Sequence, residues 1–104
     1  MSVLMCLRIE GDARRLEALA ARDPDAFPTV AARGREAGAM FHRFYANDKE
    51  ILVIDEWPDE ESFHKFFDNS PEIPKFMAEA GVTAQPQVTF YRKLELGDSI
   101  GHLD

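Results

Sequence analysis

The chain has 104 residues, of which 45% are hydrophobic and 30% are charged, and its formal charge is −7. This length suits one globular domain with a single core and excludes multidomain and repeat architectures. No apolar run approaches the ~20 residues of a membrane span, so we expect neither a membrane helix nor a signal peptide. The single cysteine, Cys6, has no partner for an internal disulfide, which favours a cytoplasmic location.

The negative charge belongs to the second half of the chain. Residues 1–52 carry equal numbers of acidic and basic side chains, whereas residues 53–104 carry 11 acids and 4 bases. Five of these acids lie within residues 55–61, where they would repel a phosphate backbone, so we expect no nucleic-acid partner. Acids in such a cluster are typical of a helix start, where they offset the positive end of the helix dipole.

The chain begins with a predicted strand and two helical segments. Residues 3–9 are almost entirely β-branched or apolar, which predicts a strand. Asp12 is suited to cap a helix that ends near Arg22. A second helical segment is predicted to begin near Pro28 and to stop at Gly38, where glycine can take the left-handed cap conformation.

A hairpin is predicted next, with strands at residues 39–46 and 51–57 joined by a polar turn around Asn47. A helix opened by Pro58 or Asp59 then carries an aromatic stripe at positions i, i+3 and i+4. Ser70 and Pro71 interrupt it, and a second apolar stripe predicts another helix that ends at Gly81. Residues 87–94 are predicted to form the last strand. The stripe of the first of these helices consists of Phe63, Phe66 and Phe67.

This order of elements predicts an α+β fold of the ferredoxin-like type, βαββαβ, with a four-stranded antiparallel sheet and helices on one face. We assign residues 1–96 to a single domain and residues 97–104 to a C-terminal tail. Both odd and even positions of the strands are apolar, so both faces of the sheet would be apolar. One layer of helices covers only one face of a sheet. We therefore expect a homodimer in which two sheets stack face to face to form a dimeric α/β barrel.

Strand pairing in the hairpin suggests a catalytic pair. If Tyr45 pairs with Glu50, then His42 lies opposite Val53 and diagonal to Asp55 on the same face of the sheet. An aspartate beside a histidine sets the imidazole tautomer and makes it a better general base. Alternatively, His42 is exposed or is a structural histidine satisfied by a hydrogen bond.

Other polar and aromatic side chains could line a site for a small molecule. Trp57 could form a wall against a flat ligand or act as a large core residue. His64 could contact a ligand or lie in solvent between two carboxylates. Tyr45 could orient a substrate through its hydroxyl or play a structural role. The phenylalanines Phe63, Phe66 and Phe67 are candidates for an apolar lining.

Several kinds of site are absent from the sequence. No cysteine or histidine spacing suits a metal, and no glycine-rich loop suits a phosphate or a dinucleotide. None of the four serines lies in a nucleophile elbow, which argues against hydrolysis by a catalytic triad. We therefore expect no metal and no bound cofactor.

Residues 53–63, VIDEWPDEESF, resemble the antibiotic-biosynthesis-monooxygenase-like group of dimeric α/β-barrel proteins. In that group an acid-x-Trp ends the third strand and an acidic helix start follows. The likeness extends to Gly38 and to the last strand, and it covers roughly residues 1–96. The group includes cofactor-independent monooxygenases, haem-degrading monooxygenases and members without an assigned activity.

The resemblance implies roles for a few residues. Trp57 matches the tryptophan that lines the pocket of active members. The helix histidine of the haem-binding members would fall at Phe66 or Phe67, and their first-strand asparagine has no counterpart here, which disfavours haem degradation. Cofactor-independent oxygenation would require a base, for which His42 and Asp55 are candidates.

Two classes of function follow from these observations. The first is a small homodimeric protein with an apolar pocket for an aromatic or hydrophobic molecule, with monooxygenase chemistry as the enzymatic form. The second is a binding or assembly module without catalysis, or an isomerase or cyclase of the same fold. A cavity reached by His42 would favour the first class, and an interior filled by aromatic side chains would favour the second.

Overall fold

The computed structural model describes residues 2–101, so residues 102–104 of the predicted tail lie outside the described part. Among the described residues, none of the helices combines the length and the apolar character needed to cross a membrane. The elements in chain order are β1 (Val3–Glu10), α1 (Ala13–Arg22), α2 (Ala26–Glu36), β2 (Phe41–Ala46), β3 (Glu50–Trp57), α3 (Glu60–Asp68), α4 (Glu72–Glu79) and β4 (Gln87–Tyr91).

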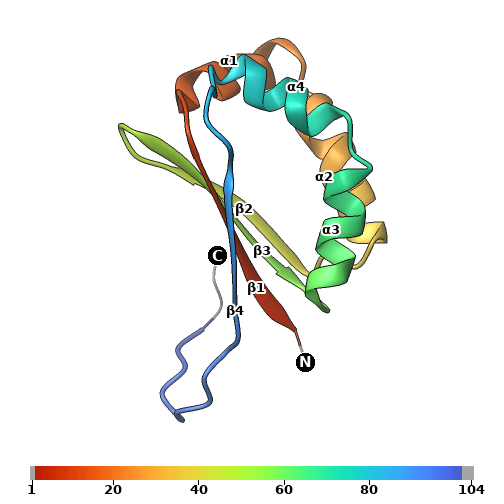
Figure 1. Ribbon diagram of the computed structural model, residues 1–104, viewed down its shortest axis with the longest axis vertical. Helices are drawn as coiled ribbons and strands as arrows, with labels where there is room; N and C mark the ends of the chain where they lie inside the picture. The colour runs from red at the N-terminus through yellow and green to blue at the C-terminus, as the bar shows by residue number, and fades with distance from the viewer. Residues whose placement is uncertain (1, 102–104) are drawn as a thin grey trace.

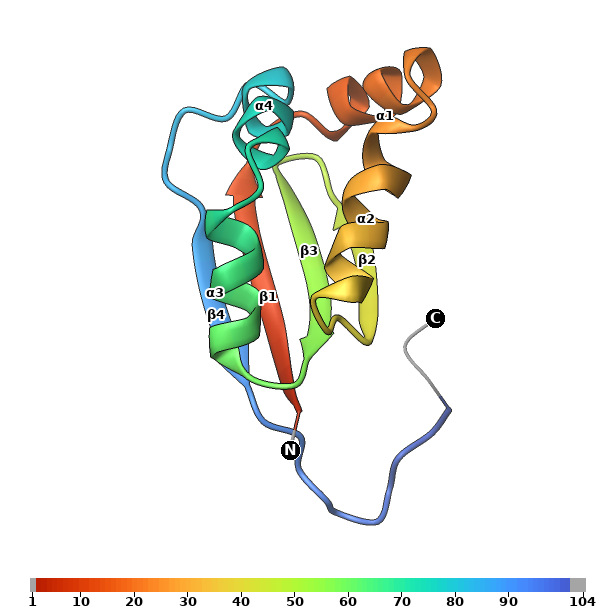
Figure 2. The same ribbon diagram turned by 90° about the vertical axis from the view of Figure 1, so that its right-hand side faces the viewer.

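The four strands form one antiparallel sheet in the order β2-β3-β1-β4. The helices lie on one side of this sheet, and no helix formed by residues 2–101 covers the other side (Figure 1). In the perpendicular view α2 lies over β2, whereas α3 lies over β4 and β1 (Figure 2). The predicted ferredoxin-like α+β fold is therefore confirmed.

Local signals account for the helix starts. Asp12 accepts a hydrogen bond from the backbone N–H of Arg14, and Asp59 accepts one from the backbone N–H of Ser62. The helix predicted from Pro28 instead begins at Ala26. Proline is tolerated in the first turn because its missing N–H would have no partner inside the helix.

The predicted helix ends and the break between the last two helices are also present. Gly38 and Gly81 have φ angles of 118° and 76°, which favour glycine. At the break after α3, the Ser70 hydroxyl donates to the carbonyl oxygen of Phe66 over 2.7 Å. This buried serine adds a second hydrogen bond to a helix-end carbonyl that also accepts the backbone N–H of Asn69.

Two predicted strands are shorter than expected. The strand predicted from residue 39 begins at Phe41, because the N–H of Ala39 bonds to the carbonyl oxygen of Gly34 and thus completes the end of α2. The last strand ends at Tyr91 rather than at residue 94. Tyr91 pairs with Leu4, close to the start of β1. Beyond Tyr91, β1 has almost no further residues with which β4 could form hydrogen bonds.

The core lies between the sheet and the helices. Most side chains of β1 and β3 that face the helices are buried, and they pack with residues from the helices. On the other face the apolar residues of the same strands are half-buried. The helices therefore cover one apolar face of the sheet except along β2, where Phe44 is 44% exposed. The buried core consists of Met5, Leu7, Ile9, Leu16, Ile51, Trp57, Phe63 and Ala80.

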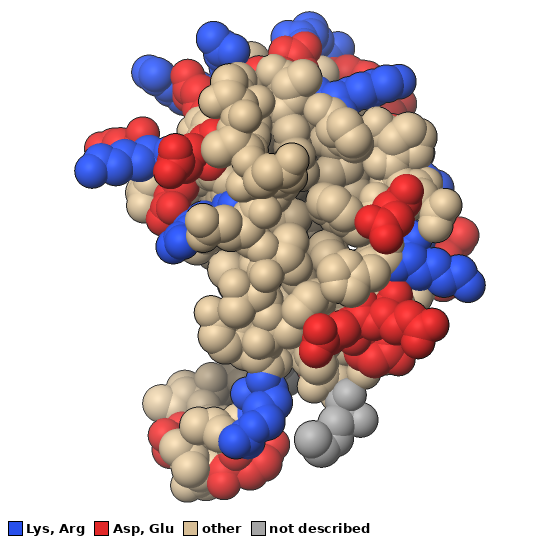
Figure 3. Space-filling model, viewed as in Figure 1, with Lys and Arg blue, Asp and Glu red and all other residues tan. Residues whose placement is uncertain are grey.

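Acidic side chains gather over the start of α3 on the face shown in Figure 3. Glu60 and Glu61 occupy its first turn, as the sequence predicted, and both are exposed. Asp55 belongs to the same acidic cluster in the sequence but not in space. Only 6% of its surface is exposed, because it points from β3 toward the helices.

Candidate functional site

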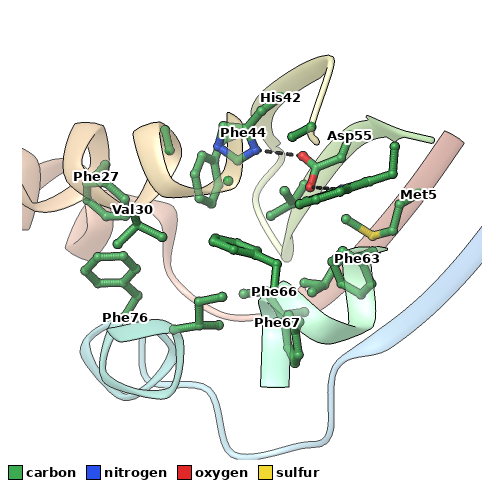
Figure 4. A pocket seen from close by; sticks show the side chains of 18 of the residues that line it. Met5, Phe27, Val30, His42, Phe44, Asp55, Phe63, Phe66, Phe67 and Phe76 are labelled. Carbon is green, nitrogen blue, oxygen red and sulfur yellow. Dashed lines mark hydrogen bonds and ion pairs between the residues drawn. The ribbon is translucent and has the colours of Figure 1, made fainter. Parts of the chain in front are cut away.

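A cavity of about 110 Å³ lies between the sheet and helices α2, α3 and α4. Aliphatic and aromatic side chains dominate its wall, and His42 and Asp55 face it from the sheet (Figure 4). The interior is thus not filled by its aromatic residues, which surround a space. This geometry favours a ligand-binding site over a purely structural core.

His42 and Asp55 are direct partners across β2 and β3. Nδ1 of His42 lies 2.7 Å from Oδ1 of Asp55. The predicted pairing of His42 with Val53 is therefore wrong by two residues, although the predicted face is correct. The turn causes the shift. The Asn47 side chain accepts from the backbone N–H groups of Lys49 and Glu50, and the backbone N–H of Asn47 donates to the carbonyl oxygen of Glu50, so that Asn47 rather than Tyr45 lies opposite Glu50.

Both carboxylate oxygens of Asp55 have a partner. Oδ2 accepts a hydrogen bond from Nε1 of Trp57 over 3.0 Å, while Oδ1 is bonded to His42. A buried carboxylate next to Nδ1 favours the tautomer that carries its proton there. Nε2 of His42 is then a hydrogen-bond acceptor and a candidate base.

The position of His42 at the edge of the sheet leaves its imidazole accessible to solvent. His42 lies on β2, which is an edge strand, and 38% of its side chain is exposed. The Asp55 side chain is only 8% exposed. The pair thus combines an oriented, buried carboxylate with an imidazole that can exchange a proton with solvent.

Aromatic rings wall the cavity on two sides. Trp57 lies at the end of β3 against Phe63 and Phe66, with ring centroids 5.8 and 5.6 Å apart. At the far end Phe27 of α2 contacts Phe76 of α4 at 4.4 Å and Phe44 of β2 at 5.7 Å. Flat, apolar walls of this kind suit an aromatic ligand.

Two of the residues proposed from the sequence do not face the cavity. Tyr45 follows the opposite parity on β2, so it points to the uncovered face of the sheet and is 44% exposed. His64 is exposed on α3, where its ring contacts Phe63 and Phe90. The six that line the cavity are His42, Asp55, Trp57, Phe63, Phe66 and Phe67.

Sequence reasoning overlooked the contribution of α2. Phe27, Val30 and Gly34 of this helix line the cavity. Their spacing of i, i+3 and i+7 marks one face of a helix and could have identified them. Gly34 faces the ring of Phe66, and a Cβ atom there would make an ordinary van der Waals contact with that ring at 3.5 Å.

An ion pair joins two of the helices that cover the cavity. Nη2 of Arg33 on α2 lies 2.6 Å from Oε2 of Glu72, the first residue of α4. A hydrogen bond from its own backbone N–H lowers the pKa of Glu72, and the Arg33 guanidinium lowers it further. Neither residue lines the cavity. The ion pair therefore joins α2 to α4 without placing a charged group on the cavity wall.

Residues 2–101 contain no group of three or more histidine, cysteine or acidic side chains arranged to hold a metal ion. The polar groups of the cavity are instead suited to accept and return a proton.

No protein-family model matches the chain, and no curated protein matches it. Solved structures do resemble it. Rv0793 from Mycobacterium tuberculosis is 16% identical with a TM-score of 0.61, over 94% of this chain and 100% of that one. SnoaB, a cofactor-independent oxygenase from Streptomyces nogalater, is 15% identical with a TM-score of 0.60, over 93% and 98%.

A protein from Bordetella bronchiseptica, provisionally named an antibiotic biosynthesis monooxygenase, is 13% identical with a TM-score of 0.63. The similarity covers 90% of this chain and 98% of that one. These identities are low, so they establish the architecture and leave the activity to be argued from the site. The chain has the ferredoxin-like α+β fold of the antibiotic-biosynthesis-monooxygenase-like proteins.

Proposed function

We propose that the protein binds a small aromatic molecule in the cavity and oxygenates it without a cofactor, with His42 as the base. The His42–Asp55 pair on the wall of an apolar cavity is the observation that carries this proposal. A base held by a buried carboxylate can generate a substrate anion next to an apolar wall. The oxygenase function of SnoaB, on the same fold, is consistent with it.

The reaction needs no redox group from the protein. Nε2 of His42 takes the hydroxyl proton of an electron-rich phenol or enol, and the resulting anion is delocalised over the ring. The anion transfers one electron to O₂, and the radical pair combines at a ring carbon that carries hydrogen. His42 returns its proton to the peroxide, which loses water. One C–H and one O–H group thus become a quinone with two carbonyls, and one O₂ yields one product oxygen and one water.

Asp55 and Trp57 assist the proton transfer by orienting His42. Asp55 keeps the proton on Nδ1 and stabilises the imidazolium that forms when Nε2 is protonated. Trp57 holds the second oxygen of Asp55 in place. The aromatic wall keeps the delocalised anion flat and away from water.

Oxygen uptake provides the test. The chain is mixed with guaiacol, 1-naphthol or anthrone, each of which has an oxidisable ring C–H or CH₂, and both O₂ consumption and quinone formation are recorded. We expect uptake with at least one of them and a loss of about 10²–10⁴-fold in His42→Ala. Tyr45→Phe, on the other face of the sheet, serves as the matched control. Equal rates for His42→Ala and the native chain would exclude His42 as the base.

We also propose that two copies associate through the uncovered face of the sheet. Apolar side chains remain half-buried there, and Tyr91 is 54% exposed. Leu94 and Leu96, which follow β4, are 55% and 71% exposed. Such surface is commonly removed from water by association. Light scattering at micromolar concentration should give twice the mass of one chain, and a monomer mass would contradict the proposal.

We propose that the protein is located in the cytoplasm, because a reducing compartment keeps an unpaired thiol reduced. Cys6 is a free thiol on the uncovered face of the sheet. Fractionation of cells that express the chain would test this assignment.

A further inference from the structure

We propose that the preferred ligand is a neutral hydroxyaromatic with a single ring, whose hydroxyl group donates a hydrogen bond to Nε2 of His42. This inference rests on the proposed function in its use of the His42–Asp55 pair, and it adds the charge, the size and the hydrogen-bonding group of the substrate. Three properties of the cavity wall support it.

The first property is the supply of hydrogen-bonding atoms. Among residues 2–101, only His42, Asp55 and Trp57 bring side-chain nitrogen or oxygen atoms to the wall. The carboxylate of Asp55 and the indole N–H of Trp57 already bond to one another, and Nδ1 of His42 is bonded to Asp55. Nε2 of His42 remains, and in this tautomer it accepts. A matching ligand therefore donates one hydrogen bond, as a phenol or an enol does.

The second property is charge. No lysine or arginine lines the cavity, and the buried carboxylate of Asp55 is part of the wall. An anionic ligand would lose its hydration without gaining a cation, and it would be repelled by Asp55. A cationic ligand would also lose its hydration, and it would compete with His42 and Trp57 for the Asp55 carboxylate. Neutral molecules avoid these costs.

The third property is size. A volume of about 110 Å³ is somewhat smaller than an engineered cavity of about 150 Å³ that holds benzene, which limits a ligand to about one ring. Phe27 and Phe76 lie at the end of the space away from Asp55 and Phe63 (Figure 4). They come from two different helices, α2 and α4. A second fused ring would have to displace this pair and separate the helices.

Calorimetric titration of the full chain with four probes tests all three properties without turnover. Phenol is the reference, anisole lacks the donor, benzoate adds a negative charge, and 1-naphthol adds a ring. We expect phenol to bind and both anisole and benzoate to bind about tenfold more weakly. We expect 1-naphthol to bind more weakly than phenol, although its larger apolar surface would otherwise strengthen binding.

Variants test which residues cause each binding preference. His42→Leu should remove the difference between phenol and anisole, and Tyr45→Phe should preserve it. Phe76→Leu should reverse the order of phenol and 1-naphthol. The proposal is overturned if phenol does not bind, if anisole or benzoate binds as tightly as phenol, or if 1-naphthol is preferred by the native chain. These native-chain comparisons remain decisive even if a variant fails to fold.

The two proposals can fail separately. If the chain selects phenol as described but consumes no oxygen with any hydroxyaromatic, then the oxygenase function is wrong and the ligand class stands. If it oxidises 1-naphthol or anthrone faster than guaiacol and binds 1-naphthol better than phenol, then the ligand class is wrong and the function stands.

Discussion

The two faces of the sheet have similar residues and different surroundings. Ile51 faces the helices and is 1% exposed, while its neighbour Leu52 faces the uncovered side and is only half-buried. Asp55 and Glu56 differ in the same way, since Asp55 is buried beside the cavity and Glu56 is half-buried on the open face. Strand parity thus decides which of two adjacent residues can belong to a core or a site.

The same comparison is the basis of the proposal that the open face binds a second copy of the chain. A strand that is apolar on both sides is stable in water when both sides are covered. The helices cover one face, and the half-buried residues of the other remain available for a second copy. Each prediction compares residues of the two faces or tests the proposed catalytic role of the hydrogen bonds among His42, Asp55 and Trp57.

The largest effect is expected for the carboxylate of the catalytic pair. Asp55→Asn should lower the rate of oxygenation by about 10²–10⁴-fold, because an amide in this place can favour the wrong imidazole tautomer. Glu56→Gln makes the same chemical change at the next residue, on the other face of the sheet, and should leave the rate within about twofold. Steady-state oxygen uptake measures both. Similar losses in the two variants would contradict the assignment of the site to the covered face.

The next effect concerns stability. Ile51→Ala should reduce the free energy of unfolding by about 3 kcal/mol, because it leaves a hole in the buried core. Leu52→Ala should cost about 1 kcal/mol in a dilute solution of single chains, since its side chain is partly in water. Urea denaturation at several protein concentrations measures both values. If copies associate through the open face, the cost of Leu52→Ala should grow with concentration, and a constant cost would count against that association.

A smaller effect is expected for the indole of Trp57. Trp57→Phe keeps an aromatic ring but removes the N–H group that bonds to Asp55, and it should cost about 1.5 kcal/mol of stability. A double-mutant cycle with Asp55→Asn isolates the contact from the loss of ring volume. We expect a coupling energy of about 1 kcal/mol. A coupling near zero would mean that Trp57 serves only as a wall.

The smallest effect is expected at the start of α3. The backbone N–H of Ser62 lowers the pKa of Asp59 below its ordinary value of 3.8 by bonding to the carboxylate. This contribution to stability is present above pH 3.8 and is lost as the pH falls through the lowered pKa. Asp59→Asn retains the capping oxygen but does not titrate. The stability difference between the native chain and Asp59→Asn should therefore be present at pH 7 and disappear near pH 2, and a pH-independent difference would disprove the linkage.

Local patterns predicted much of this fold. The helix caps at Asp12 and Asp59, the break at Ser70 and the left-handed Gly38 depend on interactions within a few residues of the chain, and all are present. The parity of the strands was also predictable, because a shift of two residues in the hairpin leaves each side chain on its face. His42 and Asp55 therefore share a face under either pairing.

Which residues contact one another at the site could not be predicted as well from the sequence. Whether His42 lies opposite Asp55 or diagonal to it depends on how the Asn47 side chain closes the turn. The closing wall of Phe27 and Phe76 joins two helices far apart in the sequence, so no local spacing relates them. Tyr45 was a reasonable candidate by residue type, but its parity places it on the other face.

The sequence by itself determined the order of the elements, their caps and the face on which each strand residue lies, because these depend on short-range backbone geometry and on periodicity. Only the tertiary structure decided that the aromatic side chains leave a space between them. It also decided that Asp55 has one oxygen on His42 and the other on Trp57. A cavity and a hydrogen-bond network depend on distances between separate elements, and those distances are set by how the helices pack on the sheet.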